Sequence, residues 1–404
     1  MRNLPNLPSH DNCCGCSACA QGCPQQCISM TPNGEGFLYP HIDTNSCIGC
    51  HVCERTCPVL KEIPTHTPQS AYAYQNPDMS IRLTSSSGGV FFEIAKSILK
   101  EDGVVFGARF NADFSVIIDF ATNIEELEAF KGSKYVQAHV NHAYIDAKRF
   151  LDADKTVLFT GTACQIAGLH HFLRKPYTNL ITIDVICHGV PSPAVWNFYL
   201  YDVKGLQSQN LQQIVFRNKE LGWRKYCMQI LSKKDSLQSC LHYEDAYMRA
   251  FLLNLSLRPS CFSCKMKSGR CGSDITMADF WGIEHVSGEK DDDKGTSLIL
   301  INTKKGDKLF KRIDGTKKEV KWQDAIRYNP SWHTSYEPHK NRSFFFRYYP
   351  LFKHHFAEFV NYATLDKPIP KRVERRLNAL LFLRKFLKIK INDNRYYHIL
   401  SVTR

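Results

Sequence analysis

The stretch CCGCSACAQGCP, residues 13–24, places five cysteines among twelve residues and ends on a proline. The spacing C-x₂-C-x₂-C-x₃-C-P recurs later in the chain, where CIGCHVCERTCP fills residues 47–58. The cysteines of the two copies are, in order, Cys13, Cys16, Cys19 and Cys23, and then Cys47, Cys50, Cys53 and Cys57. In this alignment the extra cysteine of the first copy, Cys14, corresponds to Ile48 in the second. The repeat predicts a small module with two similar halves.

Bacterial ferredoxins use this run of cysteines to bind two 4Fe-4S clusters, and the fourth cysteine of each run binds the other cluster. We therefore expect two sites with crossed ligands, one formed by Cys13, Cys16, Cys19 and Cys57 and the other by Cys47, Cys50, Cys53 and Cys23. A zinc site would leave the third and fourth cysteines of each run unexplained. A disulfide framework would need an oxidising compartment, which nothing in the sequence indicates.

The 404-residue chain has 17 cysteines, 43% apolar residues and 23% charged residues, which is the composition of a globular protein. Its first residues, MRNLPNLPSHDN, lack the apolar core of a secretory signal. No apolar run reaches the roughly 18–20 residues of a membrane span. We therefore expect a cytoplasmic protein, in which cysteines at this number indicate metal or redox chemistry rather than disulfides.

The remaining sequence alternates between helical and strand patterns. After a linker rich in proline and threonine at 61–69, a helix is predicted to start at Val90, followed by a strand hairpin at 104–110 and 116–121. Residues 156–161, 163–175 and 181–187 predict a strand, a helix and a parallel strand. Further strands are expected at 214–218, 226–231 and 297–303, with a helix at 246–258 between them.

These patterns predict an α+β (mixed α/β) protein with four segments. They are a ferredoxin-like module at 1–63, two parts of a mixed α/β domain at 70–152 and 153–335, and a basic helical tail at 340–404.

Several phrases beyond the cysteine repeat resemble the coenzyme F-420 hydrogenase/dehydrogenase beta-subunit family. They are TSSSGGVF (84–91), KGSKYVQA (131–138), GTACQIAGL (161–169), DVICHGVPSP (184–193) and RPSCFSCKMKSGRCGSDITMADFWGI (258–283). The resemblance covers roughly residues 10 to 310. It implies a flavoprotein that binds FAD in the mixed α/β domain, receives electrons from iron–sulfur clusters and reduces a substrate at the flavin.

Four cysteines on these phrases form a candidate for a third 4Fe-4S cluster. Cys164 and Cys187 follow consecutive strands of the predicted βαβ unit, whose carboxyl ends lie close together. Cys261 and Cys264 supply a nearby pair from a loop, and four soft thiolates suit a cluster. Cys271 is the alternative fourth ligand if Cys164 faces away. A zinc ribbon, or buried structural cysteines that never meet, are the other interpretations.

The flavin has two candidate phosphate loops at predicted helix starts, where free N–H groups favour anions. One contains Ser86, Ser87, Gly88 and Gly89, and the other contains Gly161 and Thr162. Ordinary helix capping also explains both loops. Lys134 and Tyr135 are candidate flavin contacts by the resemblance alone. His188 is a weak catalytic candidate, since a histidine can supply a proton near neutral pH, and the catalytic residues are otherwise unknown.

The net charge of +13 is concentrated near the C-terminus, because residues 340–404 hold 15 Lys and Arg against 4 Asp and Glu, a net charge of +11. The rest of the chain is nearly neutral, so we expect no nucleic-acid partner. Residues 372–391 predict a basic amphipathic helix that either lies on an anionic membrane surface or docks on the protein. Its apolar side holds Val373, Leu377, Leu380, Leu381 and Leu387.

The sequence therefore predicts a flavin- and iron–sulfur-dependent oxidoreductase that passes electrons from ferredoxin-type clusters through FAD to an organic acceptor. Its donor would be a redox protein such as a ferredoxin or another oxidoreductase subunit. The alternative is an electron-transfer subunit that has no substrate site and serves a partner enzyme.

Overall fold

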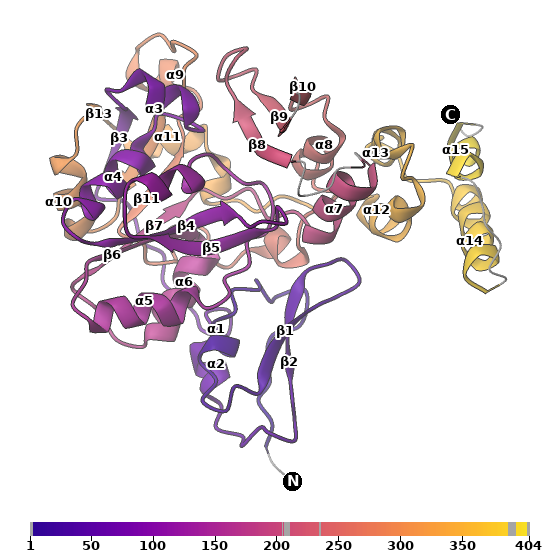
Figure 1. The fold of residues 1–404 in the computed structure, drawn as a ribbon, viewed down its shortest axis with the longest axis horizontal. Coiled ribbons are helices and arrows are strands. Elements are labelled where there is room, and N and C mark those ends of the chain that lie inside the picture. The colour runs from indigo at the N-terminus through magenta and orange to yellow at the C-terminus, as the bar shows by residue number, and fades with distance from the viewer. Residues whose placement is uncertain (1–2, 204, 206–210, 234–235, 387–392, 402–404) are drawn as a thin grey trace.

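The computed structural model describes residues 3–203, 205, 211–233, 236–386 and 393–401. Its centre is an eight-stranded sheet that takes strands from both predicted parts of the α/β domain (Figure 1). The strand order is β13 (Thr316–Val320), β3 (Ser70–Gln75), β12 (Ser297–Ile301), β11 (Ile275–Asp279), β7 (Leu180–Val185), β6 (Val157–Thr162), β4 (Val104–Phe110) and β5 (Val116–Ala121). Strands β4, β6, β7 and β11 are parallel, so their carboxyl ends share one edge of the sheet.

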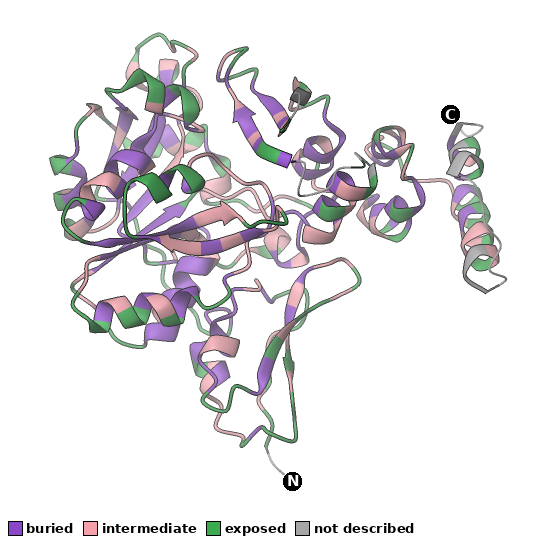
Figure 2. Cartoon of the chain, viewed as in Figure 1, coloured by how far each residue is buried: buried purple, intermediate pink, exposed green. Residues whose placement is uncertain are grey.

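Alternating apolar residues place helices on both faces of this sheet. On β4, Phe106 packs toward α5 (Ala143–Asp152) and α6 (Ala163–Leu173), whereas Val105 packs toward α4 (Val90–Leu99) and α10 (Lys304–Arg312). At the β3 end, α9 (Ile283–Ser287) and α11 (Trp322–Arg327) pack on Ala71 and Leu298. The buried residues therefore follow the sheet in two layers (Figure 2). The mixed α/β fold, the strand hairpin and the βαβ unit are as the sequence predicts.

The N-terminal module, residues 3–60, is a separate small body beside the large sheet (Figure 1). It has two short helices, α1 (Ala18–Gln21) and α2 (Val52–Thr56), and an antiparallel pair, β1 (Ile28–Pro32) and β2 (Leu38–Ile42). The module packs on α6 at Gly168, where an added Cβ would lie 3.1 Å from Cys16 Sγ and 2.7 Å from Tyr144 Oη. The close approach of the module to the sheet domain therefore requires a glycine at position 168.

Two arginines tie the module to the main domain, the fully buried Arg258 and the partly buried Arg342. Arg258, which is fully buried, donates from Nε to Cys13 O at 2.7 Å and from Nη2 to Leu38 O at 2.9 Å. Its guanidinium also lies over the ring of Tyr39, 4.2 Å from the centroid. Arg342 forms a bidentate ion pair with Glu35, with N–O distances of 2.8 and 2.5 Å. Polar groups that are desolvated and fully paired in this way fix the orientation of the module.

A second layer of structure extends from the other side of the sheet domain. It contains a three-stranded sheet and six helices (Figure 1). These elements are β8 (Leu211–Asn218), β9 (Cys227–Ser232), β10 (Ser236–Leu241), α7 (Pro193–Asn197), α8 (Ala246–Leu252), α12 (Arg342–Tyr348), α13 (Phe356–Ala363), α14 (Lys371–Phe386) and α15 (Asp393–Ser401). The remaining helix, α3 (Met79–Thr84), precedes the Ser-Gly loop of the large domain.

The C-terminal segment shares a hydrophobic core with these elements. Phe345 and Phe359 pack with Trp196 and Tyr247, and Val373 and Leu377 of α14 are fully buried in the same core. Leu380 and Leu381 are partly buried against it, whereas Leu387 lies outside the described residues. The apolar side of α14 thus faces the protein. Within the described ranges, every helix is too short or too polar to cross a bilayer.

The predicted helix at 246–258 ends earlier, at Leu252. Asn254 has a φ of +62°, and the N–H groups of Leu255 and Ser256 both donate to Ala250 O, so the chain turns back. Residues 257–261 then run beside the loop that follows β7, where Pro191 bridges to Leu257. This turn positions Arg258 toward the module and Cys261 toward the large sheet.

We expect Arg258→Met to destabilise the protein by about 3 kcal/mol, because the carbonyls of Cys13 and Leu38 would be left buried without donors. Anaerobic urea unfolding would measure the loss, and proteolysis of the 61–69 linker should become faster as the module loosens. The matched control is Arg312→Met, which removes an exposed ion pair with Glu101 and should cost less than about 1 kcal/mol. Equal stability of the two variants would contradict this role for Arg258.

Candidate functional site

The N-terminal module encloses two small cavities, each lined by four of the eight repeat cysteines. The first, the proximal cavity, is lined by Cys13, Cys16, Cys19 and Cys57, together with Cys14. The second, the distal cavity, is lined by Cys23, Cys47, Cys50 and Cys53, together with Cys27. In each cavity the fourth cysteine of one copy therefore joins the first three of the other. This grouping is the one that crossed ligation requires.

Burial makes these thiols poor anions without a metal. It raises the pKa of Cys57, raises that of Cys19 further, and raises that of Cys53 to about 11. A bound cluster compensates for this burial, because its irons hold the sulfurs as thiolates and binding releases the protons. The donor sets thus fit 4Fe-4S clusters.

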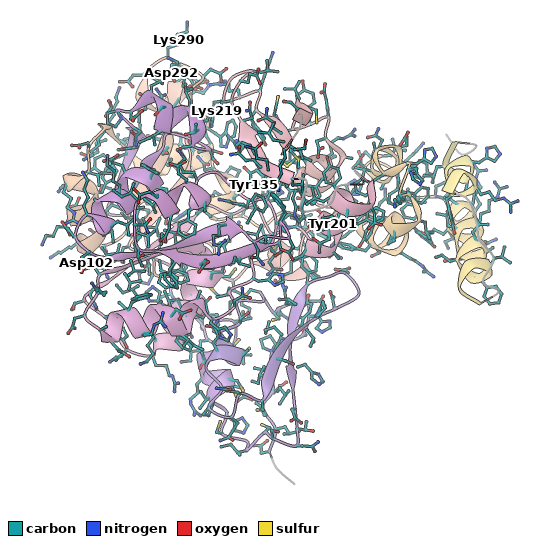
Figure 3. All side chains as sticks on the ribbon, in the orientation of Figure 1. Asp102, Tyr135, Tyr201, Lys219, Lys290 and Asp292 are labelled. Atoms are coloured by element: carbon teal, nitrogen blue, oxygen red, sulfur yellow. The ribbon has the colours of Figure 1, made fainter. Side chains whose placement is uncertain are left out.

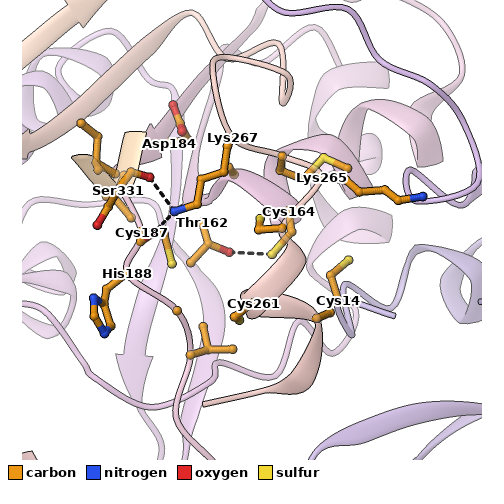
Figure 4. A pocket seen from close by; sticks show the side chains of 18 of the residues that line it. Cys14, Thr162, Cys164, Asp184, Cys187, His188, Cys261, Lys265, Lys267 and Ser331 are labelled. Atoms are coloured by element: carbon orange, nitrogen blue, oxygen red, sulfur yellow. Dashed lines mark hydrogen bonds between the residues drawn. The ribbon is translucent and has the colours of Figure 1, made fainter. Parts of the chain in front are cut away.

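A larger cavity, the thiol cavity, lies where the module meets the large sheet. The four cysteines predicted for a third cluster, Cys164, Cys187, Cys261 and Cys264, all line it (Figure 4). Cys164 stands in the first turn of α6, Cys187 follows β7, and the other two come from the segment after Arg258. Gly189 allows this convergence, since a Cβ there would lie 2.9 Å from Leu257 Cδ1 and 3.3 Å from Cys261 Cβ.

The thiols of this cavity influence one another electrostatically. The pKa of Cys261 is raised by burial and then by Cys187 and Cys264, and that of Cys187 is raised to about 12 by burial despite the nearby Lys267. Among the described residues, no three His, Cys, Asp or Glu side chains lie close enough to hold a single metal ion. A 4Fe-4S cluster needs its four cysteines farther apart than a single metal ion does, because each cysteine binds a different iron.

Cys14 lines both the thiol cavity and the proximal cavity. The Cys14 thiol is the main cause that raises the pKa of Cys164, and burial adds to it. The Cys14 carbonyl accepts from Gln137 Nε2 at 3.2 Å, which holds the loop in place. Cys271, the alternative fourth ligand, instead lies in the core, where burial and Asp184 raise the pKa of its thiol. Because Cys14 lines both of them, the thiol cavity and the proximal cavity adjoin at this residue.

His188 lies at the edge of the thiol cavity. Its Nε2 is 2.8 Å from Asn254 Oδ1, and its ring packs against that of Tyr336 in a tilted arrangement, with the ring centroids 4.3 Å apart. Burial lowers the pKa of His188, which favours the neutral imidazole. Lys267 donates from Nζ to the carbonyls of Cys187 at 2.6 Å and Ser331 at 2.5 Å, which places a buried cation beside the thiols (Figure 4).

The candidate flavin residues fall into two groups. In the first, Ser86 Oγ accepts from Ser133 N at 2.7 Å, so the Ser-Gly loop touches the segment that carries Lys134 and Tyr135. In the second, Thr162 caps α6 in a capping box with Gln165, and its Oγ lies 3.2 Å from Cys164 Sγ. Gly161 and Thr162 thus lie with the thiol cavity rather than with the Ser-Gly loop.

The start of α4 has no side-chain cap, whereas the start of α6 is capped by Thr162 and Gln165. Gly89 precedes α4 with a φ of +81°, and no side chain caps the helix. Ser87 and Gly88 are used within the fold, since Ser87 Oγ donates to Thr296 O and Gly88 N donates to Ser297 Oγ. Lys134 is partly buried, and desolvation lowers its pKa to about 7; its Nζ donates to Ala129 O and Lys131 O.

Two residues that contact the candidate flavin segments were not identified from the sequence, Arg217 in β8 and Lys219 just after that strand. Lys219 Nζ donates to Ser87 O at 2.7 Å, and Arg217 Nη1 donates to Tyr135 Oη at 3.3 Å and to Asp279 Oδ2 at 2.9 Å. Figure 3 places Lys219 and Tyr135 in the region between the large sheet and β8. The alternating cations of FRNK were the only signal in the sequence. Side chains two apart on a strand share a face, but nothing in the pattern indicates what that face meets.

The Arg217 side chain is buried and incompletely paired. Its Nε and Nη2, and the indole Nε1 of Trp223, have no hydrogen-bond partner although they are buried. Its guanidinium lies 4.0 Å from the ring centroid of Tyr226 and 5.8 Å from that of Trp281. Three unpaired buried donors at one place fit a site whose acceptor is a bound molecule.

We expect Cys57→Ala to remove the proximal cluster, which Cys13, Cys16 and Cys19 otherwise hold, and Cys23→Ala to remove the distal one. Each change should lower the iron content by about four atoms per chain. Electron paramagnetic resonance of the reduced variants should show two different remaining ferredoxin-type signals. Loss of the same signal in both variants would contradict the crossed arrangement. Cys240→Ala, in β10, is the matched control and should keep all the iron.

Comparison with protein families matches residues 12–60 to the 4Fe-4S dicluster domain. Residues 154–324 match the C terminus of the coenzyme F420 hydrogenase/dehydrogenase beta subunit. No curated protein matches the chain. Among solved structures it is similar to a chain of the F420-reducing [NiFe] hydrogenase complex from Methanosarcina barkeri, solved with xenon. That match has 14% identity and a TM-score of 0.42, and it covers 77% of this chain and 93% of the other.

The dicluster match supports two 4Fe-4S clusters in the N-terminal module. With the cavities of that module, the chain is an iron–sulfur electron-transfer protein whose residues 154–324 match the C-terminal domain of the coenzyme F420 hydrogenase/dehydrogenase beta subunit.

Proposed function

We propose that the chain is a flavin-dependent iron–sulfur oxidoreductase in which ferredoxin-type clusters, a third cluster and FAD connect an electron donor with an organic acceptor. When bound, the clusters supply one-electron transfer and the flavin supplies hydride transfer. The observation that carries the proposal is the thiol cavity, because four cysteines from three chain segments meet there beside Cys14 of the N-terminal module. Buried structural cysteines have no reason to gather at that contact.

The third cluster would be held by Cys164, Cys187, Cys261 and Cys264. Cys261 is held in place by the bond from its N–H to Arg258 O at 3.0 Å. Lys267 would offset the negative charge that four thiolates bring to the cluster, and net charge is one factor that sets a cluster potential. The domain boundaries at 1–63, 70–152, 153–335 and 340–404 remain part of the proposal.

The flavin would lie along the carboxyl edge of the large sheet, where α/β proteins bind ligands. Ser86 and the open start of α4 would face its phosphates, together with Ser87, Gly88 and Gly89, and Lys134 and Tyr135 would contact the rest. The unpaired donors of Arg217 and Trp223 support this position, since a flavin or phosphate oxygen would complete them. Gly161 and Thr162 would approach the ring from the thiol cavity.

A single side chain, that of Phe251, lies between Tyr135 of the proposed flavin site and His188 of the thiol cavity. The ring of Phe251 stacks on Tyr135 at 5.1 Å and lies edge-on to His188 at 5.2 Å. The thiol cavity has a volume of about 60 Å³, against about 20 and 10 Å³ for the proximal and distal cavities. This larger space is the one that the third cluster would fill. His188, neutral and hydrogen-bonded to Asn254, would hold a proton on the side of the cavity that leads through Phe251 to Tyr135 and the flavin.

The partners proposed are a redox protein that donates electrons and the organic acceptor. Membrane contact through the C-terminal tail would have to be electrostatic. Arg372, Arg375 and Arg376 of α14 are exposed, but Val373 and Leu377 are buried in the protein and unavailable for insertion. The proposed location is the cytoplasm.

The third cluster is tested by Cys261→Ser. We expect this variant to contain about four fewer iron atoms than the wild type, because one cluster loses a ligand in a buried site. Both ferredoxin-type signals should persist in electron paramagnetic resonance. Cys271→Ser is the matched control, since that thiol lies outside the cavity, and it should keep its iron. Full iron in the Cys261 variant would refute the third cluster.

The flavin is tested by denaturing anaerobically prepared protein and identifying the released chromophore. We expect FAD in near-equimolar amount. Arg217→Met should release most of it during gel filtration while the iron content stays unchanged, because the change removes the buried donors and the link to Tyr135. Arg224→Met, which removes a more exposed arginine paired with Glu284 and Asp291, should retain it. A wild-type protein with full clusters and no flavin would establish the electron-carrier alternative instead.

A further inference from the structure

The two halves of the N-terminal module have equivalent backbones around each cavity. Gly15 and Gly49 both have a φ of +70°, and the following left-handed residues, Ser17 and His51, have φ values of +62° and +55°. Helices α1 and α2 then begin at corresponding positions, Ala18 and Val52. Residue 14 in the first half and residue 48 in the second therefore occupy the same place relative to their cavities.

The surroundings of these two positions differ. Cys14 lies under the large domain, where it lines the thiol cavity and contacts Cys164. Ile48 lines the distal cavity, but 57% of it is exposed. It is among the most exposed large apolar residues of the described chain. The position that docks internally in one half is thus exposed to solvent in the other.

We propose that Ile48 is the centre of the docking site for an external electron-donor protein. This inference rests on the proposed function and extends it by naming the entry face. At residue 14 the module contacts the large domain, which is its proposed electron acceptor. Residue 48 is the equivalent position beside the distal cavity, so a donor protein could approach that cavity in the same way. A partner seated there would come as near to the distal cluster as Cys164 comes to the proximal one.

The chemistry of this face indicates the kind of partner. The described residues that line the distal cavity with Ile48 include no Asp, Glu, Lys or Arg; among them are Pro5, Pro24, Gln25 and His51, and the charge of the neighbouring Glu54 is paired with His51 at 2.9 Å. Leu4, 43% exposed, adds a second apolar side chain in the same N-terminal module. The partner is therefore a small one-electron carrier whose own redox group is surrounded by a neutral, apolar rim. Redox encounters of this kind need only a small interface.

The test uses the full chain with its clusters loaded and a reduced two-cluster bacterial ferredoxin as the probe. Stopped-flow absorbance measures the second-order rate of cluster reduction by the ferredoxin and, separately, by dithionite. Ile48→Glu and Ile48→Lys should each lower the ferredoxin rate about tenfold or more, because either charge would be buried against an apolar partner. The dithionite rate and the iron content should not change. Ile124→Glu, at an exposed isoleucine outside the N-terminal module, should behave as wild type in both assays.

Unchanged ferredoxin rates in the Ile48 variants would overturn the docking site, as would a wild-type protein that the ferredoxin does not reduce. A faster rate with one of the two charges would overturn the neutral partner. If Ile48→Glu loses iron, Ile48→Lys decides the question. Failure here is distinct from failure of the proposed function, because dithionite would still reduce a bound flavin in every variant.

Discussion

The buried guanidinium of Arg258 is the interaction on which the arrangement of sites depends. It binds backbone carbonyls from both the cysteine loop and β2 of the N-terminal module, while its own segment carries Cys261 and Cys264. One side chain therefore sets the distance between the proximal cavity and the thiol cavity. A lysine could not replace it, because a single ammonium lacks the planar fork that reaches Cys13 O, Leu38 O and Gln137 Oε1 together.

Further contacts also hold the N-terminal module against the main domain. The bidentate pair between Arg342 and Glu35 anchors the β1–β2 hairpin to the C-terminal segment, and Ser192 Oγ donates to the Glu35 carbonyl at 2.5 Å. Gly168 allows the cysteine loop to lie directly on α6. The module is thus held from three sides, and electron transfer across this contact does not need to wait for a domain movement. The basic tail contributes Arg342 to this framework, so part of the segment that the sequence marks as a tail is structural.

The sequence predicted well wherever a local rule applied. The cysteine spacing, the strand hairpin and the βαβ unit each follow from residues close together in the chain, and the parallel strands of the βαβ unit also implied that Cys164 and Cys187 meet. The approach of Cys261 depended on a turn at Asn254 that helical periodicity does not reveal. The contact of Cys14 with Cys164, and the link from Arg217 to Tyr135, depend on how distant segments pack, which no spacing rule contains. The second phosphate loop shows the reverse case, since Thr162 has the pattern of an anion site but caps its own helix with Gln165.

The order of the thiols along the chain has a consequence for how the protein is made. All eight repeat cysteines lie within the first 57 residues, so the N-terminal module can emerge from the ribosome and acquire its metal before the large sheet exists. The thiol cavity is complete only after residue 264 has been synthesised and β7 has paired with β11. For the proposed third cluster, its four cysteines would meet an iron–sulfur donor late, when the fold is nearly complete and the module lies beside the cavity. The clusters would therefore be inserted in two stages, and the third would have to be inserted before the N-terminal module docks over the thiol cavity.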